Sequence, residues 1–187
     1  MKFFQNRFVA TIIAALVVVG STAASAGIGL SRSCREAENA FFTAKSGKAP
    51  GYYVDQCISS ATGLCTVAGH YNDAELDRAA RELDEARDEL AEAYGERDIS
   101  DIYEAMQSLN WAAGSFRSTA EGVSLSENDR SAYEDAMARL AGAWENVEES
   151  SYNKETGSFL RVLRRGLPAL WVEIFDIDEP ELYAREG

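Results

Sequence analysis

The stretch that decides the fold is AELDRAARELDEARDELAEAYG, residues Ala74–Gly95, in which leucine recurs at every seventh position. Alanines fill the positions between the leucines, so the apolar seam reads Leu76, Ala79, Leu83, Ala86, Leu90 and Ala93. This spacing places the seam on one face of a helix. Asn72 and Glu75 resemble a capping box at its start, and Gly95 can end it. The small alanines predict that a second helix packs closely against this seam.

Two later segments repeat the pattern. The second begins after Ser100-Asp101, ends at Gly122, and carries its seam at Ile102, Met106, Leu109, Ala113, Phe116 and Ala120. The third is introduced by Ser126, with its seam at Tyr133, Met137, Leu140, Trp144 and Val147. The links at 95–99 and 122–125 are short enough to force antiparallel neighbours. The sequence therefore predicts an all-α protein, a compact antiparallel bundle with three long helices plus shorter ones. An extended dimeric coiled coil is the runner-up.

Shorter elements flank these three helices. A helix at 157–165 is expected, followed by the apolar run LPALWVEIFDI, which we expect to be buried and, because Pro168 suits a first helical turn, helical. Towards the amino terminus, a helix at 31–46 and one or two turns at 54–60 are expected. The predicted organisation is a signal peptide at 1–26, a cysteine-containing helical segment at 27–71 packed on the bundle, and the helical bundle at 72–187.

The chain opens as a secretory signal peptide does. Lys2 and Arg7 precede an apolar run at 8–19, and the small residues Ala24-Ser25-Ala26 follow it. This pattern predicts cleavage after Ala26 and a secreted or periplasmic protein without membrane insertion after cleavage. An uncleaved membrane anchor is the alternative, although the apolar run is shorter than the roughly 20 residues that span a bilayer.

The charge of the chain is strongly acidic. It has 18 Lys and Arg against 31 Asp and Glu among 187 residues, a formal charge of −13. Loss of Lys2 and Arg7 with the signal peptide leaves 16 basic residues against 31 acidic ones, or −15. Such a surface repels nucleic acid and anionic lipid and favours a cationic partner. We therefore expect no nucleic-acid partner.

Three cysteines, Cys34, Cys57 and Cys65, are candidates for a disulfide in an oxidising compartment. A bond from Cys34 to either of the others would tie the amino-terminal segment down, and the odd thiol would be buried or would join two chains. The protein is then a monomer or a disulfide-linked dimer. An alternative interpretation is a metal site formed by Cys34, Cys57, Cys65 and His70, although no C-x-x-C motif accompanies them.

Few residues suggest catalysis. The chain has one histidine and lacks both a G-x-S-x-G nucleophile motif and a glycine-rich phosphate-binding loop. Carboxylate pairs could serve a hydrolase, but among 31 acidic residues any pair is unremarkable. We expect a non-enzymatic protein with no cofactor.

Two features could contribute to binding. Trp111 falls opposite the seam of the second helix, beside Ser108, Ala112 and Ser115. We expect the amino-terminal segment to cover it, because exposed large aromatic residues are uncommon outside interfaces. The basic cluster of Arg161, Arg164 and Arg165 could hold an anion, but pairing with acidic helices is the favoured interpretation.

Cysteines ahead of a helix that contains DELAEAY, at 88–94, resemble a family of small secreted helical domains that includes bacterial lysozyme inhibitors. The leucine-aspartate pair that usually opens this stretch in the family is Ala86-Arg87 here, and Gln107 and Trp111 are spaced differently from the family's glutamine and tryptophan. No functional residue is therefore transferred. The resemblance implies that a lysozyme-like enzyme is one candidate partner. The acidic charge of this chain would attract such a cationic enzyme.

The leading hypothesis is an exported, acidic helical-bundle protein that acts by binding another protein, with a cationic partner such as a lysozyme-like enzyme. The alternative is a carrier of a small ligand or metal in the cell envelope, with its site inside the bundle or at the cysteines. A carboxylate-based hydrolase ranks last.

Overall fold

The computed structural model describes residues 7–43 and 48–184, with side chains from residue 21 onward, and these residues form helices and no strand. The all-α class is therefore confirmed. The chain divides into two units. The bundle unit comprises Ala40–Glu155 with Glu181–Gly187, and the terminal unit comprises Met1–Asn39 with Thr156–Pro180.

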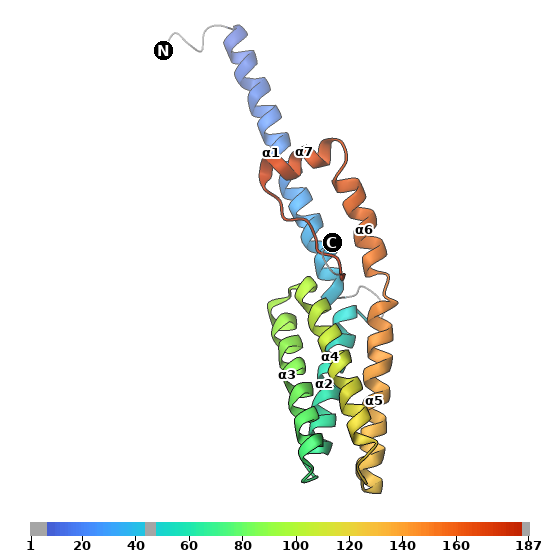
Figure 1. The fold of residues 1–187 in the computed structure, drawn as a ribbon. Helices are drawn as coiled ribbons and strands as arrows, with labels where there is room; N and C mark the ends of the chain where they lie inside the picture. The colour runs from blue at the N-terminus through green and yellow to red at the C-terminus, as the bar shows by residue number, and fades with distance from the viewer. Residues whose placement is uncertain (1–6, 44–47, 185–187) are drawn as a thin grey trace. The chain divides into compact units, whose positions relative to one another are not determined.

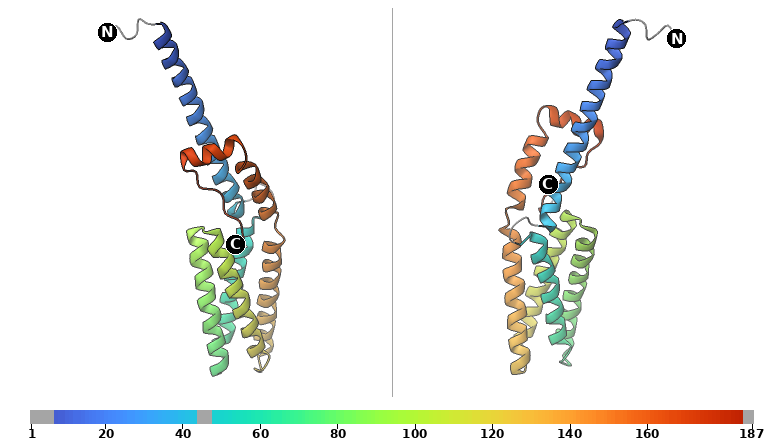
Figure 2. Two further views of the ribbon diagram at one scale, coloured as in Figure 1. Left: turned by 45° about the horizontal axis from the view of Figure 1, so that its top comes forward. Right: turned by 180° about the vertical axis from the view of Figure 1, so that it is seen from behind.

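The bundle unit contains four long helices, α2 (Pro50–Ala68), α3 (Ala74–Glu96), α4 (Ile99–Ala120) and α5 (Glu127–Glu148). Successive helices run antiparallel (Figure 1). Helix α3 packs between α2 and α4, and α5 returns to lie beside α2 (Figure 2). The helical bundle is confirmed, but it has four long helices where the sequence predicted three.

The additional helix, α2, lies where one or two turns were expected. Its buried face follows spacings of three and four residues, through Val54, Cys57, Ala61, Leu64 and Ala68. Most of these side chains are small, so α2 approaches its neighbours closely. At Gly51 a Cβ atom would stand 3.1 Å from the ring of Tyr94 and 3.2 Å from the carbonyl oxygen of Phe41. A side chain at this position would therefore make tight contacts that require its neighbours to move, which favours glycine there.

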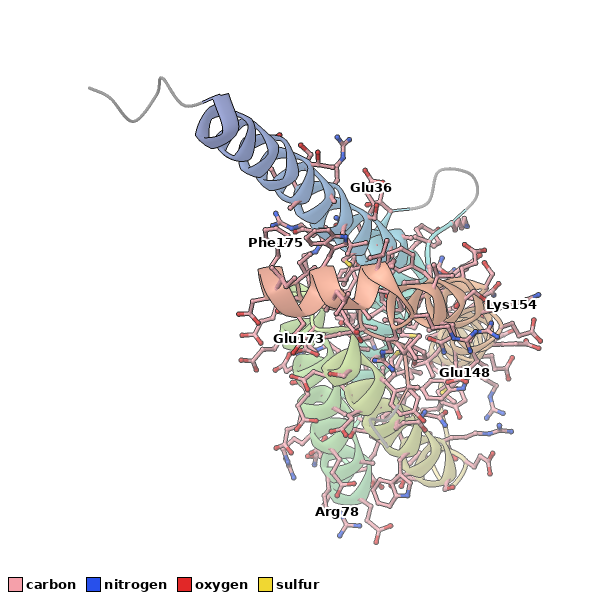
Figure 3. All side chains as sticks on the ribbon, turned by 90° about the horizontal axis from the view of Figure 1, so that it is seen from above. Glu36, Arg78, Glu148, Lys154, Glu173 and Phe175 are labelled. Atoms are coloured by element: carbon pink, nitrogen blue, oxygen red, sulfur yellow. The ribbon has the colours of Figure 1, made fainter. Side chains whose placement is uncertain are left out.

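The predicted seams of α3 and α4 are buried in the core of the bundle, whereas in the α5 seam only Leu140 and Val147 are buried and the other three side chains pack against the core half-buried. Leu76, Leu83 and Leu90 of α3 are buried, as are Met106 and Phe116 of α4. Charged side chains such as those of Arg78 and Glu148 extend outward from the helices (Figure 3). The expected bounds shift slightly: Asp73, rather than Asn72, caps α3, and the helix passes Gly95 to end at Glu96.

A carboxy-terminal strap, residues 181–183, packs against the bundle. The Glu181 carboxylate accepts hydrogen bonds from the backbone N–H of Ile99 at 2.9 Å and of Ser100 at 3.3 Å. A carboxylate at a helix amino terminus satisfies donors that lack partners within the helix. The ring of Tyr183 stacks on that of Phe41, and Asn153 bonds both the N–H and the C=O of Tyr183. The strap therefore covers the first turn of α4.

The terminal unit is built from α1 (Arg7–Phe42) up to Asn39, α6 (Tyr152–Leu163) from Thr156, and α7 (Leu167–Phe175). Cys34, Leu160 and Leu163 are its buried centre, and partly buried Leu30, Phe159, Val172 and Ile177 pack around them. Helix α1 begins well before the expected start at residue 31 and ends at Phe42. Residues 44–46 of the expected helix lie outside the described residues.

Helix α7 confirms the favoured helical interpretation of LPALWVEIF but not its expected burial. Gly166 adopts a positive φ of 64° between α6 and α7, and Pro168 occupies the first turn. None of the nine residues of α7 is buried. The expectation was wrong because this short helix turns only one side toward α1, where the ring of Phe175 lies against Gly27.

The predicted signal peptide lies partly outside the described residues. Residues 1–6 are not described, and residues 7–20 are described as helical backbone only. Among the residues whose side chains are described, 21–43 and 48–184, no helix has the length and apolar character needed to cross a membrane.

Candidate functional site

The predicted disulfide is absent. Cys34, Cys57 and Cys65 are all free thiols. Cys57 and Cys65 lie eight residues apart on α2, a rise of about 12 Å along a helix, which exceeds the Cα separation of about 7 Å that a disulfide tolerates. Cys34 belongs to the terminal unit and is buried there beside Leu160 and Leu163. The disulfide-tied amino-terminal segment is therefore corrected to a segment held by helix packing.

The two thiols of α2 are located at contacts between helices. The Sγ atom of Cys57 lies 3.9 Å from the carbonyl oxygen of Leu140 on α5, and that of Cys65 lies 3.5 Å from the carbonyl oxygen of Ala80 on α3. Burial raises the pKa of Cys57 to about 12 and is the main reason that the pKa of Cys65 rises to about 11. Thiols held protonated in this way are poor nucleophiles and poor metal ligands. Their role is to pack as small apolar side chains.

The alternative metal site is not assembled. Cys57 and Cys65 point toward different helices, α5 and α3, while the imidazole of His70 bonds Asp129 at the end of the bundle. Within the described residues no group of three His, Cys, Asp or Glu side chains could hold a metal ion.

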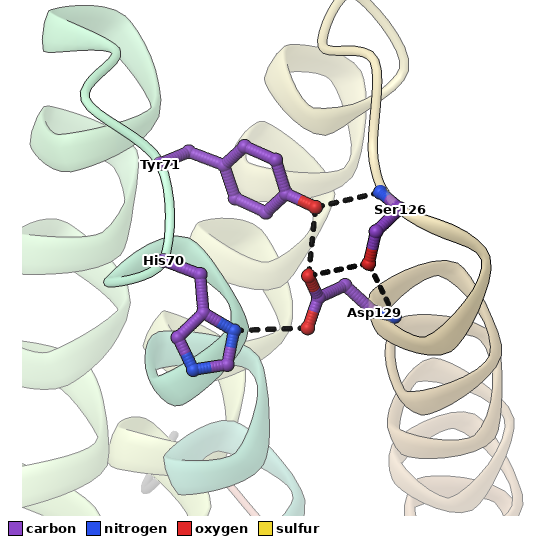
Figure 4. Close-up of polar contacts among 4 residues, drawn as sticks. All are labelled: His70, Tyr71, Ser126 and Asp129. Atoms are coloured by element: carbon purple, nitrogen blue, oxygen red, sulfur yellow. Dashed lines mark hydrogen bonds and ion pairs between the residues drawn. The ribbon is translucent and has the colours of Figure 1, made fainter.

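His70 belongs instead to a polar cluster between the α2–α3 link and the start of α5 (Figure 4). The Asp129 carboxylate accepts hydrogen bonds from His70 Nδ1 at 2.9 Å, from the Tyr71 hydroxyl at 2.8 Å and from the Ser126 hydroxyl at 2.7 Å. The backbone N–H of Ser126 donates to the Tyr71 hydroxyl at 2.7 Å. These hydrogen bonds hold the pKa of Asp129 below its ordinary value, and the bond from Ser126 contributes most.

The order of these groups differs from that of a hydrolase triad. A triad places the imidazole between the serine and the carboxylate, so that the imidazole can take the hydroxyl proton. Here the carboxylate lies between the two, and the Ser126 hydroxyl donates to Asp129. The cluster therefore serves as a clamp that joins the α2–α3 link to the amino terminus of α5.

The sequence contained one sign of this clamp. Ser126 and Asp129 form the S-x-x-D pattern of a helix start, and Ser126 does cap α5. The contacts of Asp129 with His70 and Tyr71 join residues 59 and 58 positions apart. They follow from the antiparallel packing of the helices, which no local pattern encodes.

Trp111 contradicts its expected burial. It lies on the outer face of α4 and is 75% exposed. Five neighbours on this face are uncharged, namely Gln107, Ser108, Gly114, Ser115 and Ser118, and the exposed carboxylate of Glu104 lies two turns before Trp111 on the same face. Ala112, expected on the same face, is buried. The expectation failed because it relied on a covering segment, and none of the described residues buries this indole ring. We call Trp111 and these five neighbours the tryptophan face.

The tryptophan face lies on a strongly charged unit. The bundle unit contains 11 Lys and Arg against 25 Asp and Glu, a formal charge of −14. The terminal unit from Gly27 onward is almost balanced, with 5 basic residues against 6 acidic ones. The acidity that the sequence analysis assigned to the whole protein is therefore concentrated in the bundle.

The three arginines of the basic cluster differ in their contacts. Arg164 pairs at 2.6 Å with Glu179, which lies in the segment after α7 and not on an acidic helix as the favoured interpretation expected. Arg161 donates to the carbonyl oxygen of Gly157 and to the hydroxyl of Ser158, within its own helix. Arg161 and Arg165 are exposed and line one shallow hollow with Ser158, Val162 and Pro168.

These features define the class of protein as an antiparallel four-helix bundle with buried thiols, a polar clamp at one end and an exposed tryptophan face. Comparison with protein-family models, with curated proteins and with solved structures finds no match to this chain. The likeness to the lysozyme-inhibitor family thus depends only on the cysteines ahead of α3 and the residues at 88–94.

Proposed function

We propose that this is an exported, non-enzymatic protein that binds a cationic partner protein through the tryptophan face of its bundle. The observation that supports the proposal most is the exposure of Trp111. Tryptophan is enriched among the residues that dominate binding energy at interfaces, and charged residues are depleted from the centre of such interfaces. An indole ring whose neighbours within one turn on its face are uncharged, on an otherwise acidic unit, has both properties.

Charge supports the choice of partner. The formal charge of −14 on the bundle unit favours the approach of a positively charged protein and disfavours an acidic one. In this arrangement the tryptophan face supplies the desolvated centre of the contact, and the surrounding carboxylates supply attraction at longer range. A lysozyme-like enzyme fits this chemistry. Because exposed charges are screened by salt, the affinity should fall as salt rises from low to physiological concentration.

Export is supported by the burial pattern along α1. Ser21, Thr22, Ala24 and Ser25 are exposed, and the first buried residue of the described part of α1 is Gly27. Cleavage after Ala26 would therefore remove a segment that contributes little to the packing of the terminal unit. The localisation we propose is secreted or periplasmic.

The test is a titration of the protein with a lysozyme, measured by calorimetry or by surface-immobilised binding. Trp111→Ala should weaken binding by about 30-fold or more, the effect expected of an interfacial residue that contributes roughly 2 kcal/mol. Tyr52→Ala is the matched control because Tyr52 is also an exposed aromatic residue of the bundle but lies on α2. Equal affinities of Trp111→Ala and the parent protein would refute the assignment of this face. Binding that is insensitive to salt would remove the electrostatic argument.

A further inference from the structure

The terminal unit exposes an apolar stripe that the proposed protein-binding function does not use. Leu167, Leu170 and Ile174 of α7 are 68%, 53% and 65% exposed. Their spacing of three and four residues places them on one side of the helix. Val162 on α6 is 66% exposed and adds to the apolar surface of this unit. Exposed apolar side chains gathered in this way mark a surface that binds something.

The orientation of α7 is set by its opposite side. Val172 packs against the buried centre of the unit, Trp171 lies with Leu30 and Ser33 of α1 around a small hollow, and Phe175 lies against Gly27. The carboxyl end of α7 stops at Asp176, which adopts a left-handed conformation with φ of 48°. Because these contacts hold one side of α7, Leu170 and Ile174 remain on the other side, and Leu167 lies at its edge, where it also lines the hollow of Trp171 and Leu30.

Basic side chains lie directly before the stripe. Arg161 and Arg165 line the shallow hollow that ends at Pro168, the second residue of α7. Their guanidinium groups suit phosphate oxygens. The terminal unit also lacks the acidic excess of the bundle, with 5 basic residues against 6 acidic ones from Gly27 onward. Attraction to an anionic surface therefore depends on Arg161 and Arg165, and it is opposed by the exposed carboxylates of Glu173 and Asp176 at α7.

We propose that α7 and the two arginines bind the surface of an anionic phospholipid bilayer. The stripe of Leu167, Leu170 and Ile174 enters the boundary between headgroups and acyl chains, while Arg161 and Arg165 contact lipid phosphates. A short apolar helix beside basic residues is the arrangement by which peripheral proteins bind a membrane without crossing it. The bundle unit, with its tryptophan face, is not required for this contact.

The test is co-sedimentation of the exported protein with vesicles of equal parts phosphatidylglycerol and phosphatidylcholine, compared with vesicles of phosphatidylcholine alone. We expect binding to the anionic vesicles and much weaker binding to the neutral ones. The double variant Leu170→Gln, Ile174→Gln should lower the partition coefficient at least tenfold, because both side chains are more than half exposed and their loss removes apolar contact with lipid. The double variant Arg161→Gln, Arg165→Gln should lower binding to anionic vesicles roughly thirtyfold.

Controls separate this proposal from the protein-binding one. All samples begin at the same residue, so differences between the variants do not arise from the amino terminus. Trp111→Ala should bind vesicles as the parent protein does, and the α7 variant should bind lysozyme as the parent does. An unchanged thermal unfolding curve for the α7 variant shows that it is folded. The proposal is overturned if the parent protein does not sediment with anionic vesicles, or if the α7 variant sediments equally well. It is also overturned if the parent is a dimer without lipid and the α7 variant is a monomer, because the stripe would then be a dimer interface.

Discussion

Leu83→Ala tests whether the leucine seam of α3 is the core of an intramolecular bundle. Leu83 is fully buried. Replacing a fully buried leucine with alanine typically lowers the free energy of unfolding by 2–5 kcal/mol, and we expect about 3 kcal/mol here. The bundle unit has about 120 residues, so its entropy of unfolding near the melting temperature is roughly 0.25 kcal/mol/K. A loss of about 3 kcal/mol then lowers Tm by about 12 °C.

The assay is thermal and urea unfolding followed by circular dichroism, for the parent protein and two variants. Leu170→Ala is the matched control because Leu170 is 53% exposed, and it should change the free energy of unfolding by about 0.5 kcal/mol or less. A cost below about 1 kcal/mol for Leu83→Ala would refute the reasoning. The Tm of the parent should also be independent of protein concentration, whereas the Tm of a dimeric coiled coil rises with it.

Two further predictions concern the thiols and the clamp. The secreted protein, alkylated after denaturation without reductant, should have the intact mass of a chain that begins at Gly27 and carries three labels, at Cys34, Cys57 and Cys65. Under native conditions Cys57 should resist labelling because it is buried with a pKa of about 12. A mass with only one label would mean that two of the three cysteines form a disulfide, as the sequence predicted. Asp129→Asn should lower the stability to urea at neutral pH. This difference should shrink as the pH falls below 3.8, the pKa of the carboxyl group in the unfolded chain, and through the lower pKa of the folded state. The reason is that protonation of Asp129 removes the same interactions in the parent protein. A difference that persists unchanged at acid pH would argue against the carboxylate as the centre of the clamp.

The sequence predicted the helices whose seams contain large apolar residues. In α3 the leucines at every seventh position fixed both the helix and its buried face, and the short links fixed the antiparallel order. Helix α2 was missed because much of its buried face is made of small residues such as Cys57, Ala61 and Ala68, with larger aliphatic side chains at Val54, Leu64 and Val67. Small residues are only weakly hydrophobic, so they leave a weak periodic pattern in the sequence. They nevertheless pack as well as leucine where two helices approach closely. Cys57 was taken for a disulfide candidate when it is a core position of that helix.

The sequence was less informative about the surface. The position of Trp111 opposite the seam of α4 was identified correctly, but whether another segment covers it depends on packing between distant parts of the chain. The same holds for α7, whose composition indicated burial. Composition records how apolar a helix is, while exposure depends on how many sides of it meet other helices. Both errors therefore concern side chains whose environment is decided by tertiary structure, and both identify the surfaces proposed here for binding.

The distribution of charge explains how one chain can carry two such surfaces without interference. Carboxylates dominate the bundle unit, where an anionic bilayer would be repelled and a cationic protein attracted. In the terminal unit acidic and basic residues nearly balance, and Arg161 and Arg165 line a hollow with the exposed side chain of Val162. Salt should weaken both interactions, but by different extents. Lysozyme binding depends on charge for its approach, whereas the apolar stripe of α7 should retain part of the vesicle binding when the phosphates are screened. Measuring both affinities over one salt series would therefore separate the two surfaces in the parent protein, without any substitution.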